Sequence, residues 1–217
     1  MNDFRYATSW FAPKISDHDA VESATQISSR HLMVQRKYSR PFSLAAVTGV
    51  ETLTPKMVDK ILDETQAEII CLVPKASHYL WAAREKAQAR GSDVQTMSEV
   101  FWAITEEDPK GFLNKDVAIT RRILGQHSRV RTVEMICEAS MKLIREGARS
   151  DLHLAVEYQY EFGVEALVRA LERHPGVKVV LNSNPNGRET SAALTHAGHA
   201  GVRLLGMSSL MSELGKL

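Results

Sequence analysis

The sequence has few of the features that mark specialised classes of protein. Its two cysteines, Cys71 and Cys137, lie far apart and show neither Cys-x-x-Cys nor zinc-ligand spacing, which excludes a disulfide framework and a zinc finger. We expect both to be buried apolar groups in a reducing cytosol. No N-terminal apolar run resembles a signal peptide, and no run is long enough to span a bilayer. A cytoplasmic protein without membrane partners is therefore expected.

Neither sign of charge is in clear excess, because the sequence has 27 basic and 26 acidic residues. A protein dominated by a global basic field is excluded, although a local basic groove is still compatible with this balance. Phosphate-binding loops, dinucleotide fingerprints and Ser/His/Asp spacings are also missing. The chain of 217 residues, 44% of them hydrophobic, is long enough for one large domain or two small ones.

What is present is a regular order of strands and helices in the first half. Thr54 and Pro55 mark the start of a helix, and the apolar run ended by Pro74 is typical of a buried strand. The expected elements are strands over 4–11, 20–26 and 31–38, an ambiguous segment over 41–49, helices over 54–65, 77–91 and 97–105, and a buried strand over 67–74.

The second half repeats this order. The expected elements there are a strand over 152–162, a helix over 163–176, a buried strand over 177–183, a helix over 188–201 and a short helix over 207–214. A constant shift without gaps places 54–101 on 164–211, with Gly91 on Gly201. Short strands expected over 92–96 and 202–206 also correspond, and this register through five elements predicts an internal duplication.

The two halves differ upstream of the repeated block. Helical spacing of apolar residues predicts helices over 116–126 and 129–148, and the segment 105–114, with its Glu-Glu-Asp-Pro and Gly, predicts a boundary. The expected domains are a first unit over 1–105, a helical connector over 106–148 and a second unit over 149–217. The expected fold class is α/β, with two tandem units that each contain a small mixed sheet flanked by helices.

One constellation in the first half could carry chemistry. Gln35 and Lys37 are two residues apart on a strand and so share a face, and Asp19 opens the strand before it. A carboxylate and an amide oxygen are hard ligands for a divalent metal at a phosphodiester, and a nearby ammonium can stabilise charge in the transition state. The alternative interpretation is a half-buried strand with one solvated face.

The stretch DAVESATQISSRHLMVQRKYSR, residues 19–40, resembles the catalytic hairpin of the PD-(D/E)XK nuclease superfamily. The resemblance is closest to the Mrr-type restriction endonucleases, in which Gln replaces the usual Glu and the strand reads Val-Gln-x-Lys-x-Tyr. It covers about 19–104 and again 152–214. It implies two restriction-endonuclease-like units, with Asp19 and Gln35 as ligands of Mg²⁺ or Mn²⁺ and Lys37 as the catalytic lysine.

The resemblance also implies a difference between the copies. The N-terminal helix that usually precedes the hairpin is expected to be absent or very short here. The second copy is expected to place Glu157 and Gln159 where Gln35 and Lys37 stand, so it lacks the lysine and would serve as an internal partner.

Three classes of function follow from these observations. The first is metal-dependent DNA cleavage, in restriction or phage defence as the resemblance implies, with Arg36, Arg40, Arg121 and Arg122 contacting nucleic acid. The second is a catalytically inactive, nuclease-derived subunit that binds nucleic acid or a protein partner in a larger complex or an oligomer. The third is an α/β scaffold with no nucleic-acid role. Convergence of Asp19, Gln35 and Lys37 in a cleft would separate the first class from the others.

Overall fold

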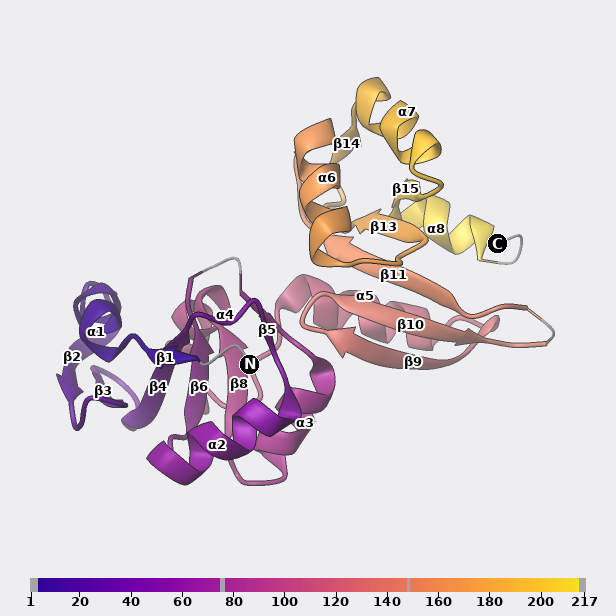
Figure 1. Ribbon diagram of the computed structural model, residues 1–217. Helices are drawn as coiled ribbons and strands as arrows, with labels where there is room; N and C mark the ends of the chain where they lie inside the picture. The colour runs from indigo at the N-terminus through magenta and orange to yellow at the C-terminus, as the bar shows by residue number, and fades with distance from the viewer. Residues whose placement is uncertain (1–3, 75–76, 148, 215–217) are drawn as a thin grey trace. The chain divides into compact units, whose positions relative to one another are not determined.

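The computed structural model describes residues 4–74, 77–147 and 149–214. The remaining residues, which the expected domain ranges include, lie outside this description. The chain divides into two compact units, unit 1 (Met1–Leu113) and unit 2 (Asn114–Leu217). Each unit is a mixed sheet flanked by helices (Figure 1), so the predicted α/β class with two units is confirmed.

Unit 1 has the following elements in chain order: β1 (Arg5–Tyr6), α1 (Thr8–Ser16), β2 (Val21–Gln26), β3 (Leu32–Arg36), β4 (Phe42–Thr48), β5 (Thr52–Leu53), α2 (Pro55–Thr65), β6 (Ile69–Leu72), β7 (His78–Tyr79), α3 (Trp81–Gln88), β8 (Asp93–Thr96) and α4 (Met97–Ala103). The main sheet has the strand order β2-β3-β4-β6-β8. Strands β2, β3 and β4 are antiparallel, whereas β4, β6 and β8 are parallel, and β1 pairs with β4.

Helices cover both faces of the unit 1 sheet. One apolar cluster joins Phe11 and Ile15 of α1 and Val100 of α4 to alternate residues of the strands. The other joins Ile61 of α2 and Ala83 of α3 to the opposite face. Since successive strand residues point to opposite faces, the central strands are buried on both sides and read as continuous apolar runs.

Unit 2 has a parallel set of elements: α5 (Lys115–Gly125), β9 (Val130–Cys137), β10 (Ser140–Arg145), β11 (Leu152–Glu157), β12 (Glu161–Phe162), α6 (Val164–Arg173), β13 (Val179–Asn182), β14 (Arg188–Glu189), α7 (Ser191–His199), β15 (Arg203–Gly206) and α8 (Met207–Glu213). Its sheet order is β15-β13-β11-β10-β9. Helices α6 and α7 pack on one face, while α5 contacts β9 and β11 and α8 contacts β13 and β15.

The two units share one topology. Each contains a helix, an antiparallel three-stranded meander, a short strand and two further helix–parallel strand steps, and each ends in a helix. The short strands also correspond, because β5 pairs with β7 in parallel and β12 pairs with β14 in parallel. The predicted correspondence of 54–101 with 164–211 is therefore confirmed, and it extends upstream through the first helix and the hairpin of each unit.

Two predicted elements are wrong. The strand expected over 4–11 is β1 followed by α1, because Phe11 and Ile15, four residues apart, face the core together. The helix expected over 129–148 is the β9–β10 hairpin. Met141, Leu143 and Arg145 are buried, while the residues between them are partly exposed. This period of two belongs to a strand. The hairpin and α5 lie in unit 2, so 106–148 contains no helical connector.

None of the helices in the described ranges is long and apolar enough to cross a membrane.

Candidate functional site

The site expected from the sequence lies at one end of the β2–β3 hairpin. The strands pair antiparallel with Ser23 opposite Gln35, which confirms the predicted pairing. Beyond the end of β3, the backbone N–H of Lys37 donates to the carbonyl oxygen of Ala20 at 3.0 Å. The chain before β2, where Asp19 lies, therefore runs beside the chain after β3.

The three side chains differ in their surroundings. Asp19 is exposed and lies in the turn before β2 instead of in the strand, Lys37 is exposed, and Gln35 is partly buried. Among the described residues, no hydrogen bond or ion pair joins them, and no group of three or more His, Cys, Asp or Glu could hold a metal ion. Asp19 and Gln35 have oxygen donors of the kind that Mg²⁺ prefers, but in small number. The donor chemistry fits, whereas the preorganisation typical of a built metal site is not present here.

A histidine closes the turn that leads into β2. The His18 Nδ1 atom accepts the backbone N–H of Ala20 at 3.1 Å, and the His18 carbonyl accepts that of Val21 at 2.9 Å. The imidazole lies against Phe101 of α4, with ring centroids 6.0 Å apart. Sequence reasoning missed this residue because it was directed at the neighbouring carboxylates.

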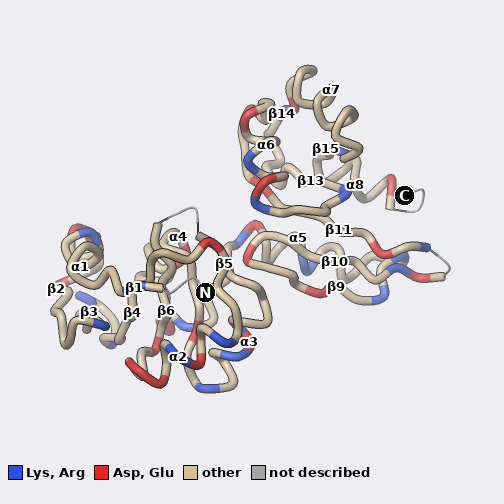
Figure 2. The backbone as a smooth tube through the Cα atoms, viewed as in Figure 1, with Lys and Arg blue, Asp and Glu red and all other residues tan. Residues whose placement is uncertain are grey.

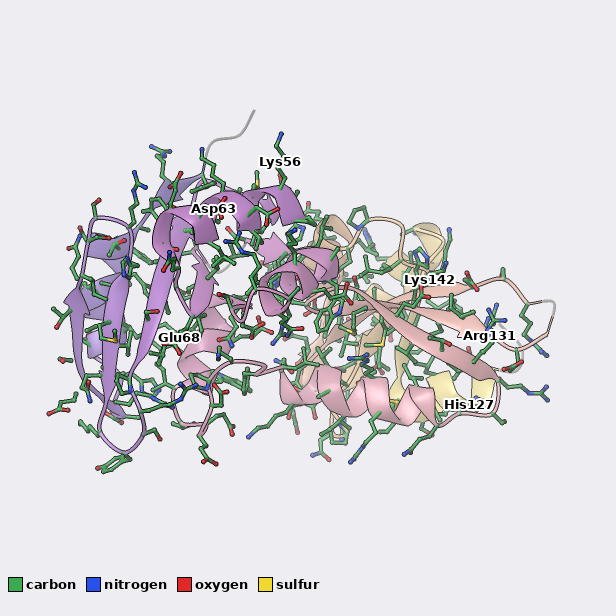
Figure 3. All side chains as sticks on the ribbon, turned by 90° about the horizontal axis from the view of Figure 1, so that it is seen from below. Lys56, Asp63, Glu68, His127, Arg131 and Lys142 are labelled. Carbon is green, nitrogen blue, oxygen red and sulfur yellow. The ribbon has the colours of Figure 1, made fainter. Side chains whose placement is uncertain are left out.

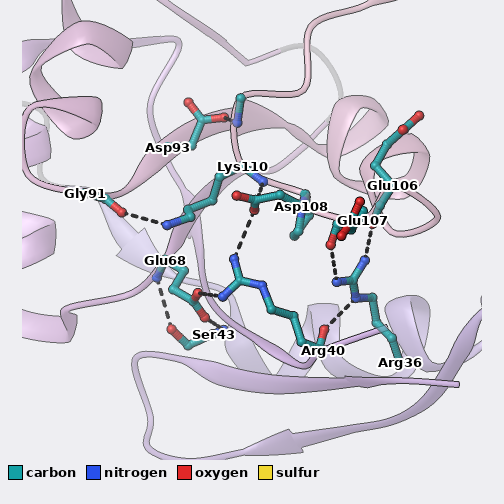
Figure 4. Close-up of polar contacts among 12 residues, drawn as sticks. Arg36, Arg40, Ser43, Glu68, Gly91, Asp93, Glu106, Glu107, Asp108 and Lys110 are labelled. Atoms are coloured by element: carbon teal, nitrogen blue, oxygen red, sulfur yellow. Dashed lines mark hydrogen bonds and ion pairs between the residues drawn. The ribbon is translucent and has the colours of Figure 1, made fainter. Parts of the chain in front are cut away.

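Arg36, expected to contact nucleic acid, is buried with 2% of its surface exposed. Its guanidinium donates to the carbonyl oxygens of Arg40 at 2.8 Å and Glu107 at 3.1 Å (Figure 4). It also donates to the Ile104 carbonyl oxygen at 3.0 Å. Burial lowers the pKa of Arg36. The guanidinium therefore supports the end of α4 and the chain after it, and it does not reach the surface as the expected phosphate contact requires.

Arg40 belongs to an ion-pair network at the amino ends of β4 and β6. Its guanidinium lies 3.6 Å from the carboxylate of Glu68 and 3.1 Å from that of Asp108. Glu68 in turn accepts the backbone N–H of Ser43 at 2.8 Å and donates its own backbone N–H to the Ser43 hydroxyl at 3.0 Å (Figure 4). These contacts fasten the segment after α4 to the sheet, and both carboxylates compete with any phosphate for Arg40.

A second polar network lies deep in unit 1. Arg84 and Asp93 form a bidentate pair with both N···O distances at 2.9 Å, and their side chains are almost fully buried. The Tyr79 hydroxyl accepts from Arg84 at 3.1 Å, and the Arg84 guanidinium also donates to the Phe112 carbonyl. Because these groups satisfy one another, this network is structural and not a reactive site.

The hairpin of unit 2 shows which residues replace the expected triad. Glu146 donates its backbone N–H to the Arg129 carbonyl at 3.0 Å, as Lys37 does to Ala20, so Glu146 stands in the place of Lys37. Counting back along β10, Ile144 stands in the place of Gln35, and both are partly buried. The predicted placement of Glu157 and Gln159 on Gln35 and Lys37 is wrong, because Glu157 ends β11, which corresponds to β4.

Glu157 instead belongs to a charge cluster at the carboxyl end of β11. Arg173, at the end of α6, donates through Nε to the Glu138 carboxylate at 3.0 Å. Burial raises the pKa of Glu157, the nearby guanidiniums of Arg173 and Arg169 lower it, and Glu138 raises it further. The Arg173 guanidinium therefore neutralises part of the negative charge of both carboxylates.

Cys137 and His174 lie side by side next to this cluster, with Sγ and Nδ1 3.3 Å apart. The arrangement has the composition of a nucleophile and its base. However, burial raises the pKa of the Cys137 thiol to about 11, with a further contribution from Glu138. The sulfur is thus a protonated thiol at neutral pH, 4% exposed, and its position is that of an inert core residue.

The remaining expected nucleic-acid residues, Arg121 and Arg122, are exposed on α5. They belong to a basic segment that continues into β9, where Arg129 and Arg131 are also exposed. Figure 2 shows basic residues near the start of β9 and the end of β10, and Figure 3 shows His127 and Arg131 at the junction of α5 and β9. Among the described residues, Arg122, Arg129 and Arg131 form no ion pair. We refer to these three as the arginine surface.

Comparisons with known proteins add no assignment: no family model, curated protein or solved structure matches the chain. The fold and the geometry of the site define a duplicated α/β protein with structural polar networks in both units and a basic segment in unit 2.

Proposed function

We propose that the protein is a nuclease-like DNA-binding protein that holds duplex DNA through the arginine surface and does not cleave it. The observation that carries this proposal is the lack of acidic partners for Arg122, Arg129 and Arg131 in the described parts of the chain. An exposed guanidinium without a carboxylate is available for the bidentate contact that phosphate groups favour.

The contrast with the other arginines supports this choice. Six other exposed or half-exposed arginines have a carboxylate within ion-pair distance; these pairs are Arg30–Glu64, Arg40–Asp108, Arg90–Asp63, Arg169–Glu165, Arg173–Glu138 and Arg203–Glu213. A chain with nearly balanced charge would be expected to pair its surface cations in this way. Three unpaired arginines within ten residues therefore indicate a partner outside the chain.

The absence of cleavage in this proposal rests on what occupies the expected positions. In unit 2, the positions of Gln35 and Lys37 hold Ile144 and Glu146, and neither can act as a metal-bound amide or a cationic catalyst. In unit 1, the three candidate side chains lack the polar contacts that fix a catalytic residue among the described residues.

The test is the affinity for a labelled 20-base-pair DNA duplex in low salt. The variant Arg122→Gln/Arg129→Gln/Arg131→Gln should lose most of the binding, since each phosphate contact contributes to an electrostatic affinity. A matched control changes two paired arginines of the same unit, Arg169→Gln/Arg203→Gln, and should bind nearly as the wild type does. Equal losses of binding free energy per removed charge in the two variants would show that the binding reflects total charge and not this surface.

A second candidate function is metal-dependent cleavage of DNA at Asp19, Gln35 and Lys37. The observation in its favour is the hydrogen bond from the Lys37 N–H to the Ala20 carbonyl, which holds the two ends of the hairpin together. Mg²⁺ or Mn²⁺ bound by Asp19 and Gln35 would supply Lewis-acid chemistry at the phosphodiester. In this function, Lys37 would stabilise negative charge on the reacting phosphate.

A nuclease assay with a metal titration separates the two candidates. If the site is active, Asp19→Ala should abolish Mg²⁺-dependent cleavage, and Lys37→Ala should slow it by roughly a hundredfold or more. Gln159→Ala, in unit 2, is the matched control and should leave cleavage intact. Wild-type protein that binds the duplex but leaves it uncut with either metal supports the binding function alone.

A further inference from the structure

A hollow of about 480 Å³ opens at the carboxyl ends of β4 and β6 in unit 1. Its volume falls within the range of roughly 300–1,000 Å³ that is common for small-molecule sites. The residues that define it are Arg5, Tyr6, Trp10, Thr48, Val73 and Pro74. Ligands of open α/β sheets commonly bind at the carboxyl ends of parallel strands, next to the point where the strand order changes. Here β4 pairs in parallel with β6 and antiparallel with β1.

The walls of the hollow combine an aromatic surface with positive charge. Trp10 is 48% exposed, and the Lys14 ammonium lies 4.5 Å from the centre of its indole ring. Arg5 is exposed and stands opposite Thr48 in the β1–β4 pairing. Among the described residues Arg5 has no acidic partner. An indole beside two cations matches a planar aromatic ligand that carries negative charge.

The opposite wall is held in place. The Tyr6 hydroxyl donates to the Glu64 carboxylate at 2.7 Å, and the Arg30 guanidinium lies over the Tyr6 ring. Val73 donates its backbone N–H to the Val47 carbonyl at 2.9 Å, which fixes the chain at the end of β6. The Tyr6 and Val73 parts of the wall are therefore anchored before a ligand binds.

Unit 2 has a hydrogen-bond network at the corresponding strand ends. The Asn182 side-chain oxygen accepts the backbone N–H groups of Gln159 and Asn184, and the Ser183 hydroxyl donates to the Glu157 carbonyl. These loops follow β11 and β13, which correspond to β4 and β6. In this part of the fold, unit 1 lacks this network and has the hollow.

We infer that the hollow binds a nucleoside phosphate, with the base stacked on Trp10 and the phosphate paired with Arg5. The choice of a nucleoside phosphate as the ligand rests on the proposed function, because every nucleic-acid strand contains bases joined to phosphate groups. The same chemistry is present in a free nucleotide and in an unpaired nucleotide of a strand, and the experiment has an arm for each.

The experiment measures affinities by isothermal titration calorimetry for wild type and variants, and follows the tryptophan fluorescence of the wild type, with adenosine 5′-monophosphate, adenosine and a single-stranded oligo(dA) as ligands. Adenosine 5′-monophosphate should quench the fluorescence, and adenosine should bind more weakly because it has no phosphate for Arg5. Trp10→Ala should weaken binding roughly tenfold or more, in line with the loss of one stacked base. Arg5→Gln should reduce the preference for the phosphate-bearing ligand.

Trp102→Ala is the matched control, because Trp102 is 53% exposed on α4 and is not one of the residues that line the hollow. It should retain wild-type affinity. Tighter binding of oligo(dA) than of the mononucleotide would assign the hollow to a strand, and equal binding would assign it to a free nucleotide. No saturable binding of either ligand at millimolar concentration, or equal affinities for Trp10→Ala and wild type, would overturn the inference.

The nucleotide-binding experiment can fail or succeed independently of the test of the proposed function. The triple glutamine variant of the arginine surface should bind adenosine 5′-monophosphate as the wild type does, because its substitutions lie in unit 2. If wild-type protein binds duplex DNA through that surface but no mononucleotide or oligo(dA), the inference about the hollow fails and the proposed function stands.

Discussion

In both units, a histidine closes the turn between the first helix and the first strand of the sheet. His18 and His127 each accept a backbone N–H on Nδ1 at 3.1 Å and a second one on the carbonyl oxygen at 2.9 Å. Arg36 and Arg145 correspond as well, because each is buried and donates through Nε to a carbonyl in the turn that follows its strand. The features that the copies share are therefore those that shape the fold.

The residues around these shared positions differ in charge. Unit 1 has the pair Asp17 and Asp19 where unit 2 has Gln126 and Ser128. Unit 2 has the pair Arg129 and Arg131 where unit 1 has Ala20 and Glu22. Both pairs are exposed, so neither supports the core. After a duplication, exposed residues whose charge differs between the copies on a preserved backbone are free to serve interactions outside the chain. The surface positions at which the two copies differ in charge are therefore the best candidates for contacts with a partner.

The largest difference between the copies concerns buried charge. The position of Asp93, on β8, corresponds to that of Arg203 on β15. Asp93→Ala should lower the free energy of unfolding by about 3–5 kcal/mol, because it leaves the Arg84 guanidinium buried without its carboxylate. In unit 2, Glu213→Ala removes the half-exposed partner of Arg203 and should cost less than about 1 kcal/mol. Urea denaturation of both variants measures the two values, and similar losses would contradict the assignment of the unit 1 network as a structural core.

A close backbone approach in unit 2 gives the next largest effect. A Cβ atom at Gly187 would lie 2.3 Å from the Asn182 side-chain nitrogen and 2.6 Å from the Gln159 carbonyl oxygen. Gly187→Ala should therefore destabilise the protein by about 1–3 kcal/mol, the range for overpacked sites. The corresponding residue of unit 1 is Ser77, and Ser77→Ala, which removes only one hydrogen bond to the Val50 carbonyl, should cost about 1 kcal/mol. Thermal unfolding compares the two; an unchanged midpoint for Gly187→Ala would contradict the tight packing described for that loop.

These two predictions rest on features that the sequence did not reveal. The repeated helix–strand order from Thr54 onward could be predicted, because caps, apolar periods and a gap-free register agree there. The hairpin of unit 2 could not be predicted, because Val133 and Ile136 are three residues apart, which is also the spacing of a helix face. The alternation of buried and exposed residues that identifies β10 as a strand includes Arg145, whose burial the sequence does not indicate. A prediction from hydrophobic patterns places every arginine at the surface, so it misses an arginine that is buried.

The candidate site was predictable in part for a similar reason. Strand alternation and the turn between β2 and β3 correctly brought Lys37 near the chain at Asp19. The identity of the residues in the corresponding positions of unit 2 depends on strand pairing, which motif spacing does not specify. Glu157-x-Gln159 looked like Gln35-x-Lys37 in sequence, yet the two motifs lie on different strands of the meander.

The pH dependence of stability should also differ between the units. Burial raises the pKa of Glu157 above its unfolded value, so ionisation of this carboxyl opposes folding. Its favourable contribution is present below the unfolded pKa and is lost as the pH rises through the folded pKa. Glu157→Gln should therefore raise the free energy of unfolding at pH 7 relative to wild type and change it little at pH 4.

The corresponding position in unit 1 is the buried Val47, which has no charge to titrate. Denaturation of Glu157→Gln and wild type at both pH values is the measurement. A variant that is less stable at pH 7 would show that the pairing of Glu157 with Arg173 outweighs the cost of its burial.

The most direct test of the proposed function is the salt dependence of duplex DNA binding by wild type, Arg129→Gln and Arg131→Gln. A plot of the logarithm of the association constant against the logarithm of the salt concentration gives a slope of about −0.9 for each phosphate neutralised. If the arginine surface holds the DNA backbone, each substitution should make this slope shallower by about one, while Arg203→Gln should leave it unchanged. Slopes that are identical for wild type and for both variants would contradict the proposed function.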